Sequence, residues 1–114
     1  MDDLHIRQQG KAVFVSLAGE LTLGLTARLK DELSALMLEN WEVLIVELSG
    51  VEFMDSSGIG LLVAASNRTK QADRGFYLYN PSTPVVKTLK LVNLFNFFSM
   101  LRSEEELPGA VNGF

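Results

Sequence analysis

The spacing of hydrophobic residues changes several times along the chain, and each change marks an expected element. Apolar residues recur at every second position from 13 to 18, which predicts a strand. A strand over residues 4–8 is expected to pair with it across the turn Gln9-Gly10-Lys11. After Gly24 the apolar spacing becomes three or four residues, which predicts an amphipathic helix. Its apolar stripe consists of Leu25, Leu29, Leu33 and Leu36.

The middle of the chain continues this alternation of strands and helices. The continuous apolar run over residues 43–46 is typical of a central strand that is covered on both faces. A short apolar patch over residues 51–54 follows Gly50. The spacing is then helical from Ile59 to about Asp73, and Gly75 is expected to cap that helix. A further strand is predicted around residues 76–79.

The last third predicts shorter elements. Thr83-Pro84 fits the N-cap and first turn of a helix that ends near Leu91. Phe97-Phe98 is expected to open a last strand, and residues 103–106 resemble the capping box of a final helix.

The order of these elements predicts the fold class. Strands that alternate with helices form a largely parallel sheet with right-handed connections, here after an antiparallel hairpin. We therefore expect a single α/β domain with a mostly parallel mixed sheet of about five strands and about four α-helices. The domain is expected to cover residues 1–107, with a C-terminal tail over residues 108–114.

The composition narrows the functional classes. The 114 residues include no cysteine, which excludes disulfides, thiolate zinc sites and cysteine nucleophiles. Ten basic and fourteen acidic residues give a net charge of −4 without a basic cluster, so nucleic-acid binding is not expected. The apolar runs are shorter than a membrane span, and the acidic start Met1-Asp2-Asp3 does not fit a signal peptide. We expect a cytoplasmic protein that binds no membrane.

The segment Asp55-Ser56-Ser57-Gly58 joins a predicted strand to a predicted helix. Parallel sheets bind ligands at this edge, and the first N–H groups of a helix lack internal partners and favour anions. A phosphate added to a serine here would be tolerated. Helix capping alone also explains an aspartate and a serine at this place, so both interpretations stay open. Asp55 would then either orient the Ser56 hydroxyl or cap the turn.

The helix that follows is apolar nearly all the way round in its first two turns. Leu61 and Ala64 lie off the stripe formed by Ile59, Leu62 and Ser66. This pattern predicts an apolar docking surface beside Ser56. Cover by neighbouring helices is the alternative.

Residues 53–60, with the sequence Phe-Met-Asp-Ser-Ser-Gly-Ile-Gly, resemble the signature of the STAS domain, specifically that of bacterial anti-sigma factor antagonists. Further matches are Gly19-Glu20-Leu21, the strand over residues 43–48, and Asn80-Pro81-Ser82 with Val85-Val86. The resemblance implies that an anti-sigma factor serine kinase phosphorylates Ser56. The unphosphorylated chain would bind that kinase and free a sigma factor, and a PP2C-type phosphatase would restore this form.

The resemblance also implies a partner-binding set and shows two departures. The expected set is Asp55, Ser56, Ser57, Gly58, Ile59, Leu61 and Thr22. Thr22 stands where the family often has an acid, which could change the partner. Asn93 replaces the usual glycine before the last strand, and asparagine tolerates the left-handed conformation needed there.

Two other functional classes compete with this interpretation. An enzyme is not expected, because the chain lacks a Gly-x-Ser-x-Gly elbow and has His5 as its single histidine. No metal site, catalytic residue or cofactor is predicted. The second alternative is a STAS subunit of a lipid-transport or other signalling complex that is never phosphorylated. We expect a monomer or a weak homodimer.

Overall fold

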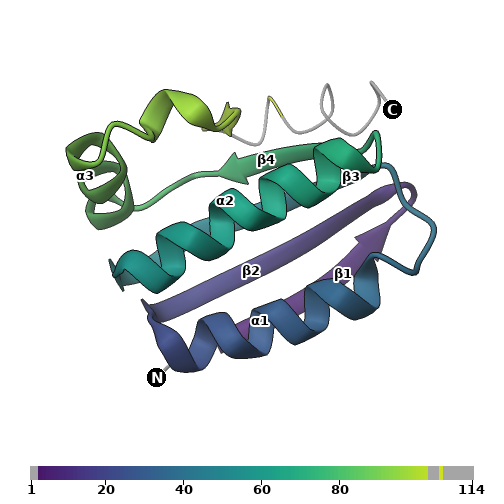
Figure 1. The fold of residues 1–114 in the computed structure, drawn as a ribbon, viewed down its shortest axis with the longest axis horizontal. Helices are drawn as coiled ribbons and strands as arrows, with labels where there is room; N and C mark the ends of the chain where they lie inside the picture. Colours follow the sequence, from purple (N-terminus) through teal and green to yellow (C-terminus); the bar gives the residue numbers. More distant parts are fainter. Residues whose placement is uncertain (1–2, 103–105, 107–114) are drawn as a thin grey trace.

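The computed structural model describes residues 3–102 and residue 106. Its elements alternate between strands and helices (Figure 1). The strands are β1 (Asp3–Gln9), β2 (Ala12–Leu21), β3 (Val43–Met54), β4 (Gly75–Tyr79) and β5 (Met100–Leu101). The helices are α1 (Leu23–Leu36), α2 (Ser56–Gln71), α3 (Thr83–Leu91) and the 3-10 helix η1 (Phe95–Phe97).

The five strands form one sheet in the order β1-β2-β3-β4-β5. Only the pair β1–β2 is antiparallel, and its turn contains Gly10 at a φ of 60°. The other three pairs are parallel. The α/β class and the mostly parallel five-stranded sheet are therefore confirmed. The described residues contain three α-helices, against about four expected; the fourth was predicted over residues 103–106, most of which lie outside the described residues, as does the tail over residues 108–114.

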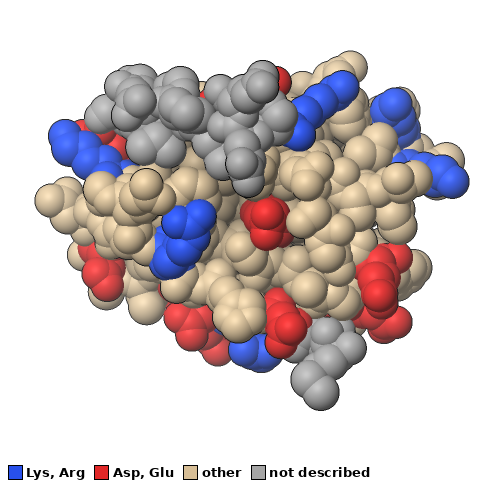
Figure 2. Space-filling view, turned by 180° about the vertical axis from the view of Figure 1, so that it is seen from behind, with Lys and Arg blue, Asp and Glu red and all other residues tan. Residues whose placement is uncertain are grey.

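The sheet has two different faces. Helices α1 and α2 lie side by side against one of them (Figure 1). The main core lies on this face, because the alternating residues Val13, Val15 and Leu17 of β2 pack with the expected helix stripe. The opposite face carries a smaller cluster around Phe14 and Ile45. Figure 2 shows this second side, where acidic side chains are scattered over a mostly uncharged surface.

Three predicted features around β3 and α2 differ from the structure. β3 runs unbroken through Gly50, because a Cβ there would lie 2.9 Å from the Cβ of Ala18 and only glycine allows the close strand pairing. α2 begins at Ser56 rather than Ile59, since Asp55 is its N-cap. Its C-terminal cap is also not Gly75. The left-handed residue after α2 is Asp73, at a φ of 59°.

The C-terminal elements differ from the prediction by one to three residues. The N-cap of α3 is Ser82, not Thr83, and Pro84 lies in the first turn. Ser82 accepts from Val85 N at 3.4 Å and donates to the Val51 carbonyl at 2.6 Å. Phe97-Phe98 does not open a strand, because η1 ends there and β5 begins at Met100. Asn93 has a φ of 59°, as its replacement of glycine predicts.

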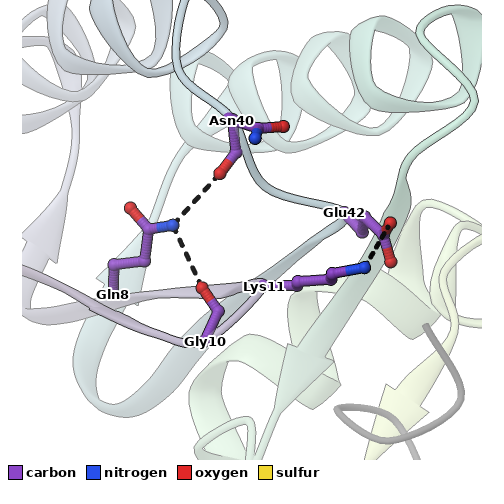
Figure 3. Close-up of polar contacts among 5 residues, drawn as sticks. All are labelled: Gln8, Gly10, Lys11, Asn40 and Glu42. Atoms are coloured by element: carbon purple, nitrogen blue, oxygen red, sulfur yellow. Dashed lines mark hydrogen bonds and ion pairs between the residues drawn. The ribbon is translucent and has the colours of Figure 1, made fainter.

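The end of the sheet that carries the β1–β2 turn, which we call the turn end, is held by polar contacts between distant segments. Gln8 Nε2 donates to the carbonyls of Gly10 and Asn40 at 3.1 and 3.2 Å (Figure 3). Lys11 pairs with Glu42 at 3.3 Å in the same view. These contacts tie the hairpin turn to the connection between α1 and β3.

Candidate partner-docking site

The opposite end of the sheet carries the predicted site. Thr22 follows β2 and Asp55 follows β3, and the last residues of these strands, Leu21 and Met54, are paired in register. Asp55 N also donates to the Leu21 carbonyl at 3.4 Å. As a result α1 and α2 begin next to each other, with Thr22 and Asp55 as their N-caps.

Asp55 is tied into the start of α2 by its own side chain. Its Oδ1 accepts hydrogen bonds from Ser57 Oγ at 2.5 Å, Ser57 N at 3.0 Å and Gly58 N at 3.2 Å. The Ser57 hydroxyl, more than any other group, holds the pKa of Asp55 below its usual value. Burial, the next largest cause, opposes it, and the backbone N–H groups of Gly58, Ser57 and Asp55 lower the pKa further. Of the two roles left open for Asp55, the structure shows the cap, and the hydroxyl that Asp55 orients is that of Ser57.

Ser56 is the first residue of α2 and is exposed. Among the described residues its hydroxyl has no hydrogen-bond partner, so the oxygen is available to another protein. The N–H groups of Ser57 and Gly58, which could have received a phosphate, already donate to Asp55. A phosphate on Ser56 would therefore lie beside a carboxylate as well as at the positive end of a helix.

Gly58 is buried and allows the close packing of α2 on the strand ends. A Cβ at this position would lie 2.6 Å from the Leu21 carbonyl oxygen and 2.8 Å from Met54 Cγ. The glycine is therefore needed for the contact between α2 and the end of β2. Its place in the expected partner-binding set stays a prediction.

A groove of about 410 Å³ runs between the two helices from this point. We call it the α1–α2 groove. Its lining includes Leu23, Ala27 and Lys30 of α1, and Ser57, Leu61 and Arg68 of α2. Ala64 is exposed in this groove, whereas Leu61 is half-buried and also packs against the main core. The docking of a partner on these two residues stays a prediction. Ser57 belongs both to this groove and to the Asp55 cap.

The remaining predicted residues have mixed positions. Ile59 is half-buried and packs against the main core. Thr22 is half-buried and its side chain makes no capping hydrogen bond.

Two exposed apolar residues beside the site were not predicted as part of it. Leu23 is 73% exposed at the start of α1, and Phe53 is 51% exposed opposite Glu20 at the end of β3. Leu23 is an apolar residue outside the stripe of its helix, and this position was the sequence signal for its exposure.

The described residues contain neither a metal-binding cluster nor a helix that could span a membrane. Residues 3–102 and 106 hold no group of three or more His, Asp or Glu side chains that could bind a metal ion. Within the same residues, no helix has the length and apolar character needed to cross a bilayer.

Comparison with known proteins identifies the family. The family model described as "STAS domain" matches residues 3–107. The chain belongs to the STAS domain family. This agrees with the resemblance carried by residues 53–60.

Curated STAS relatives are similar over most of their length. The anti-sigma-B factor antagonist of Listeria monocytogenes is 24% identical over 95 residues, which are 83% of each chain. The anti-sigma-B factor antagonist of Staphylococcus aureus is 27% identical over 92 residues, or 81% of this chain and 85% of the relative.

Solved STAS structures share the fold. The anti-sigma factor antagonist SpoIIAA in its unphosphorylated form gives a TM-score of 0.81 at 24% identity, with 98% of both chains covered. An anti-sigma factor antagonist from Mycobacterium paratuberculosis gives 0.85 at 20% identity, over 98% of this chain and 95% of the other. The Bacillus protein SpoIIAA in its phosphorylated form gives 0.75 at 22% identity, over 96% and 99%.

Proposed function

We propose that this STAS domain is an anti-sigma factor antagonist that works by partner switching and is not an enzyme. The unphosphorylated chain binds an anti-sigma factor serine kinase, so that a sigma factor is freed. Phosphorylation of Ser56 releases the kinase, and a PP2C-type phosphatase restores binding. The observation that carries the proposal is the exposed, unbonded Ser56 hydroxyl at the start of α2. The curated relatives named as anti-sigma-B factor antagonists support it.

The geometry explains how one phosphate acts as a switch. Phosphorylation adds about 1.5 to 2 negative charges at pH 7. The charge would arise next to Ser57, which lines the α1–α2 groove with exposed Leu23 and Ala64, apolar side chains whose burial by a partner favours binding. A partner that covers these side chains would have to desolvate or oppose the new anion. Each 1.4 kcal/mol lost weakens binding about tenfold, so release requires no large change in the STAS domain itself.

The carboxylate of Asp55 adds to this effect. Asp55 is ionised at neutral pH and its oxygens accept from Ser57 and Gly58. The phosphate would thus add charge beside an existing charge, and the donors nearest to it are already engaged. The result is a concentrated negative site at the place where the partner must dock.

Binding to the kinase tests the proposal. Isothermal calorimetry should show that Ser56→Ala binds as tightly as the unphosphorylated chain and cannot be released by ATP. Ser56→Asp should bind at least about tenfold more weakly. Ser99→Asp is the matched control, because Ser99 is an exposed serine between η1 and β5. Mass spectrometry after kinase treatment should find one phosphate, on Ser56 and not on Ser57.

Two outcomes would contradict the proposal. Equal affinities of Ser56→Ala and Ser56→Asp would show that charge at this position does not control binding. Tight binding of the phosphorylated chain would point instead to the non-switching interaction subunit of a larger complex.

A further inference from the structure

The α1–α2 groove has an apolar middle and a cationic far end. Buried Leu33 and Ala65 lie at its floor, and Leu23 and Leu61 lie along its sides. At the end remote from Ser56, Arg68 Nη1 donates to Ser34 Oγ at 3.4 Å, which connects the two helices. The groove is therefore open beside the phosphoacceptor and bounded by polar groups at the other end.

The charges in the groove are all of one sign. Among the described residues that line it, Lys30 and Arg68 are the only charged ones, and both are exposed. The whole chain carries a net charge of −4, so a groove with two cations and no carboxylate differs from the average surface. An occupant with a negative group at this end would find complementary charge.

The shape of the groove indicates the kind of occupant. From Ser57 to Arg68 the groove follows about three turns of α2, or about 16 Å at about 1.5 Å per residue. Gly60 and Ala64 are small, so the α2 side of the groove projects little at these positions. The space where a Gly60 side chain would stand is open. Small residues allow helices to approach closely, and an amphipathic helix commonly inserts its apolar face into such a groove.

We propose that the α1–α2 groove receives a three-turn amphipathic helix of the kinase that phosphorylates Ser56, with an acidic side chain of that helix against Lys30 and Arg68. This inference rests on the proposed function, because the groove begins at Ser57, next to the phosphoacceptor. The apolar face of the helix covers Leu61 and Ala64. The groove thereby selects the partner, whereas Ser56 decides whether that partner stays bound.

Charge reversal in and outside the groove tests the proposal. The double variant Lys30→Glu/Arg68→Glu is compared with Arg28→Glu/Lys70→Glu, which makes the same change in net charge on the same two helices outside the lining. The groove variant should bind the purified kinase about tenfold more weakly than the control variant. In Ser56 phosphorylation assays it should raise KM and leave kcat within about twofold, since the groove does not contact the transferred phosphoryl group.

Filling the groove provides a second, charge-independent test. Ala64→Trp replaces an exposed lining residue and should weaken kinase binding, whereas Ala35→Trp, exposed on α1 outside the lining, should not. Circular dichroism would verify that both variants are folded.

The outcomes separate this inference from the proposed function. If the unmodified chain is bound and phosphorylated at Ser56 but both groove variants behave like their controls, only the groove proposal is wrong. If the kinase neither binds the unmodified chain nor phosphorylates it, the proposed function fails, and the groove proposal fails with it. If Ala64→Trp abolishes a dimer of this chain in sedimentation equilibrium and leaves kinase affinity unchanged, the groove is a self-association surface and the proposal is overturned.

Discussion

Polar side chains at the turn end of the sheet form hydrogen bonds to neighbouring segments. At the opposite end, the Ser56 hydroxyl has no hydrogen-bond partner within the described residues. At the turn end, Gln8 bridges two carbonyls, and Glu42 N donates to the Lys11 carbonyl at 2.8 Å. At the Ser56 end, the side chains of Leu23 and Phe53 remain exposed. The turn end thus secures the fold through polar contacts, whereas the Ser56 end leaves one hydroxyl and two large apolar side chains exposed.

Trp41 is the strongest single anchor of the turn end. Its indole Nε1 donates to the Leu36 carbonyl at 2.8 Å, and the Arg74 guanidinium stacks 4.1 Å from its ring. Arg74 Nη2 in turn donates to the Glu39 carbonyl at 3.0 Å. One aromatic side chain thus links the connection after α1 to the connection before β4.

The largest expected effect is therefore at Trp41. Trp41→Ala should lower the free energy of unfolding by about 3–5 kcal/mol, because a buried aromatic is lost and the Arg74 guanidinium loses its stacking partner. Urea denaturation followed by circular dichroism measures the change. Phe97→Ala, at an exposed aromatic, should cost far less. Equal losses for the two variants would contradict the assignment of Trp41 as an anchor.

The next largest effect is at Gly58, where the Ser56 end has its own structural requirement. Gly58→Ala should destabilise the fold by about 1–3 kcal/mol, because its Cβ would meet the Leu21 carbonyl. Gly24→Ala is the control, since no atom lies within 4 Å of a Cβ at that position, and it should stabilise the fold by up to about 1 kcal/mol. Both are read from urea denaturation. A harmless Gly58→Ala would show that α2 can shift away from β2.

The smallest expected effect concerns the charge of Asp55. The native pKa lies below that of the unfolded chain, so the stabilisation is complete above about pH 4 and is lost as the pH falls through the lower, native pKa. The difference in unfolding free energy between the unmodified chain and Asp55→Asn should shrink over that range. NMR titration of the carboxyl group should show that Ser57→Ala raises the pKa of Asp55. An unchanged pKa in that variant would sink the assignment of Ser57 as the main donor.

The regular parts of the fold were predictable because each depends on local periodicity. The stripe from Leu25 to Leu36 and the alternation from Val13 to Leu17 are both packed as their spacing predicts. The boundaries that failed depend on distant contacts. Ser82 rather than Thr83 caps α3 because its hydroxyl also reaches the Val51 carbonyl, and Gly50 stays within β3 because Ala18 lies beside it.

The position of Asp55-Ser56-Ser57-Gly58 between a strand and a helix was predictable, but the hydrogen bonds within this segment were not. Both roles considered for Asp55 require the same residue types, and only the backbone geometry decides that its donors are Ser57 and Gly58. The exposure of Phe53 could not be predicted from the sequence, since an aromatic residue within a strand is ordinarily part of a core. The pairing of β4 with β3 ends at Glu47, so β4 does not extend beside Phe53, and the residues around Phe53 in the sequence do not reveal this.

The four residues of the motif Asp55-Ser56-Ser57-Gly58 have unequal structural roles. Three of the four residues are constrained by folding: the cap, its hydroxyl donor and the glycine beneath it. Ser56 is exposed and, within the described residues, its side chain makes no hydrogen bond that holds this junction. Under the proposed function, replacement of Ser56 would therefore remove the switch without unfolding the start of α2, so this motif reports the architecture of the junction more directly than its regulation.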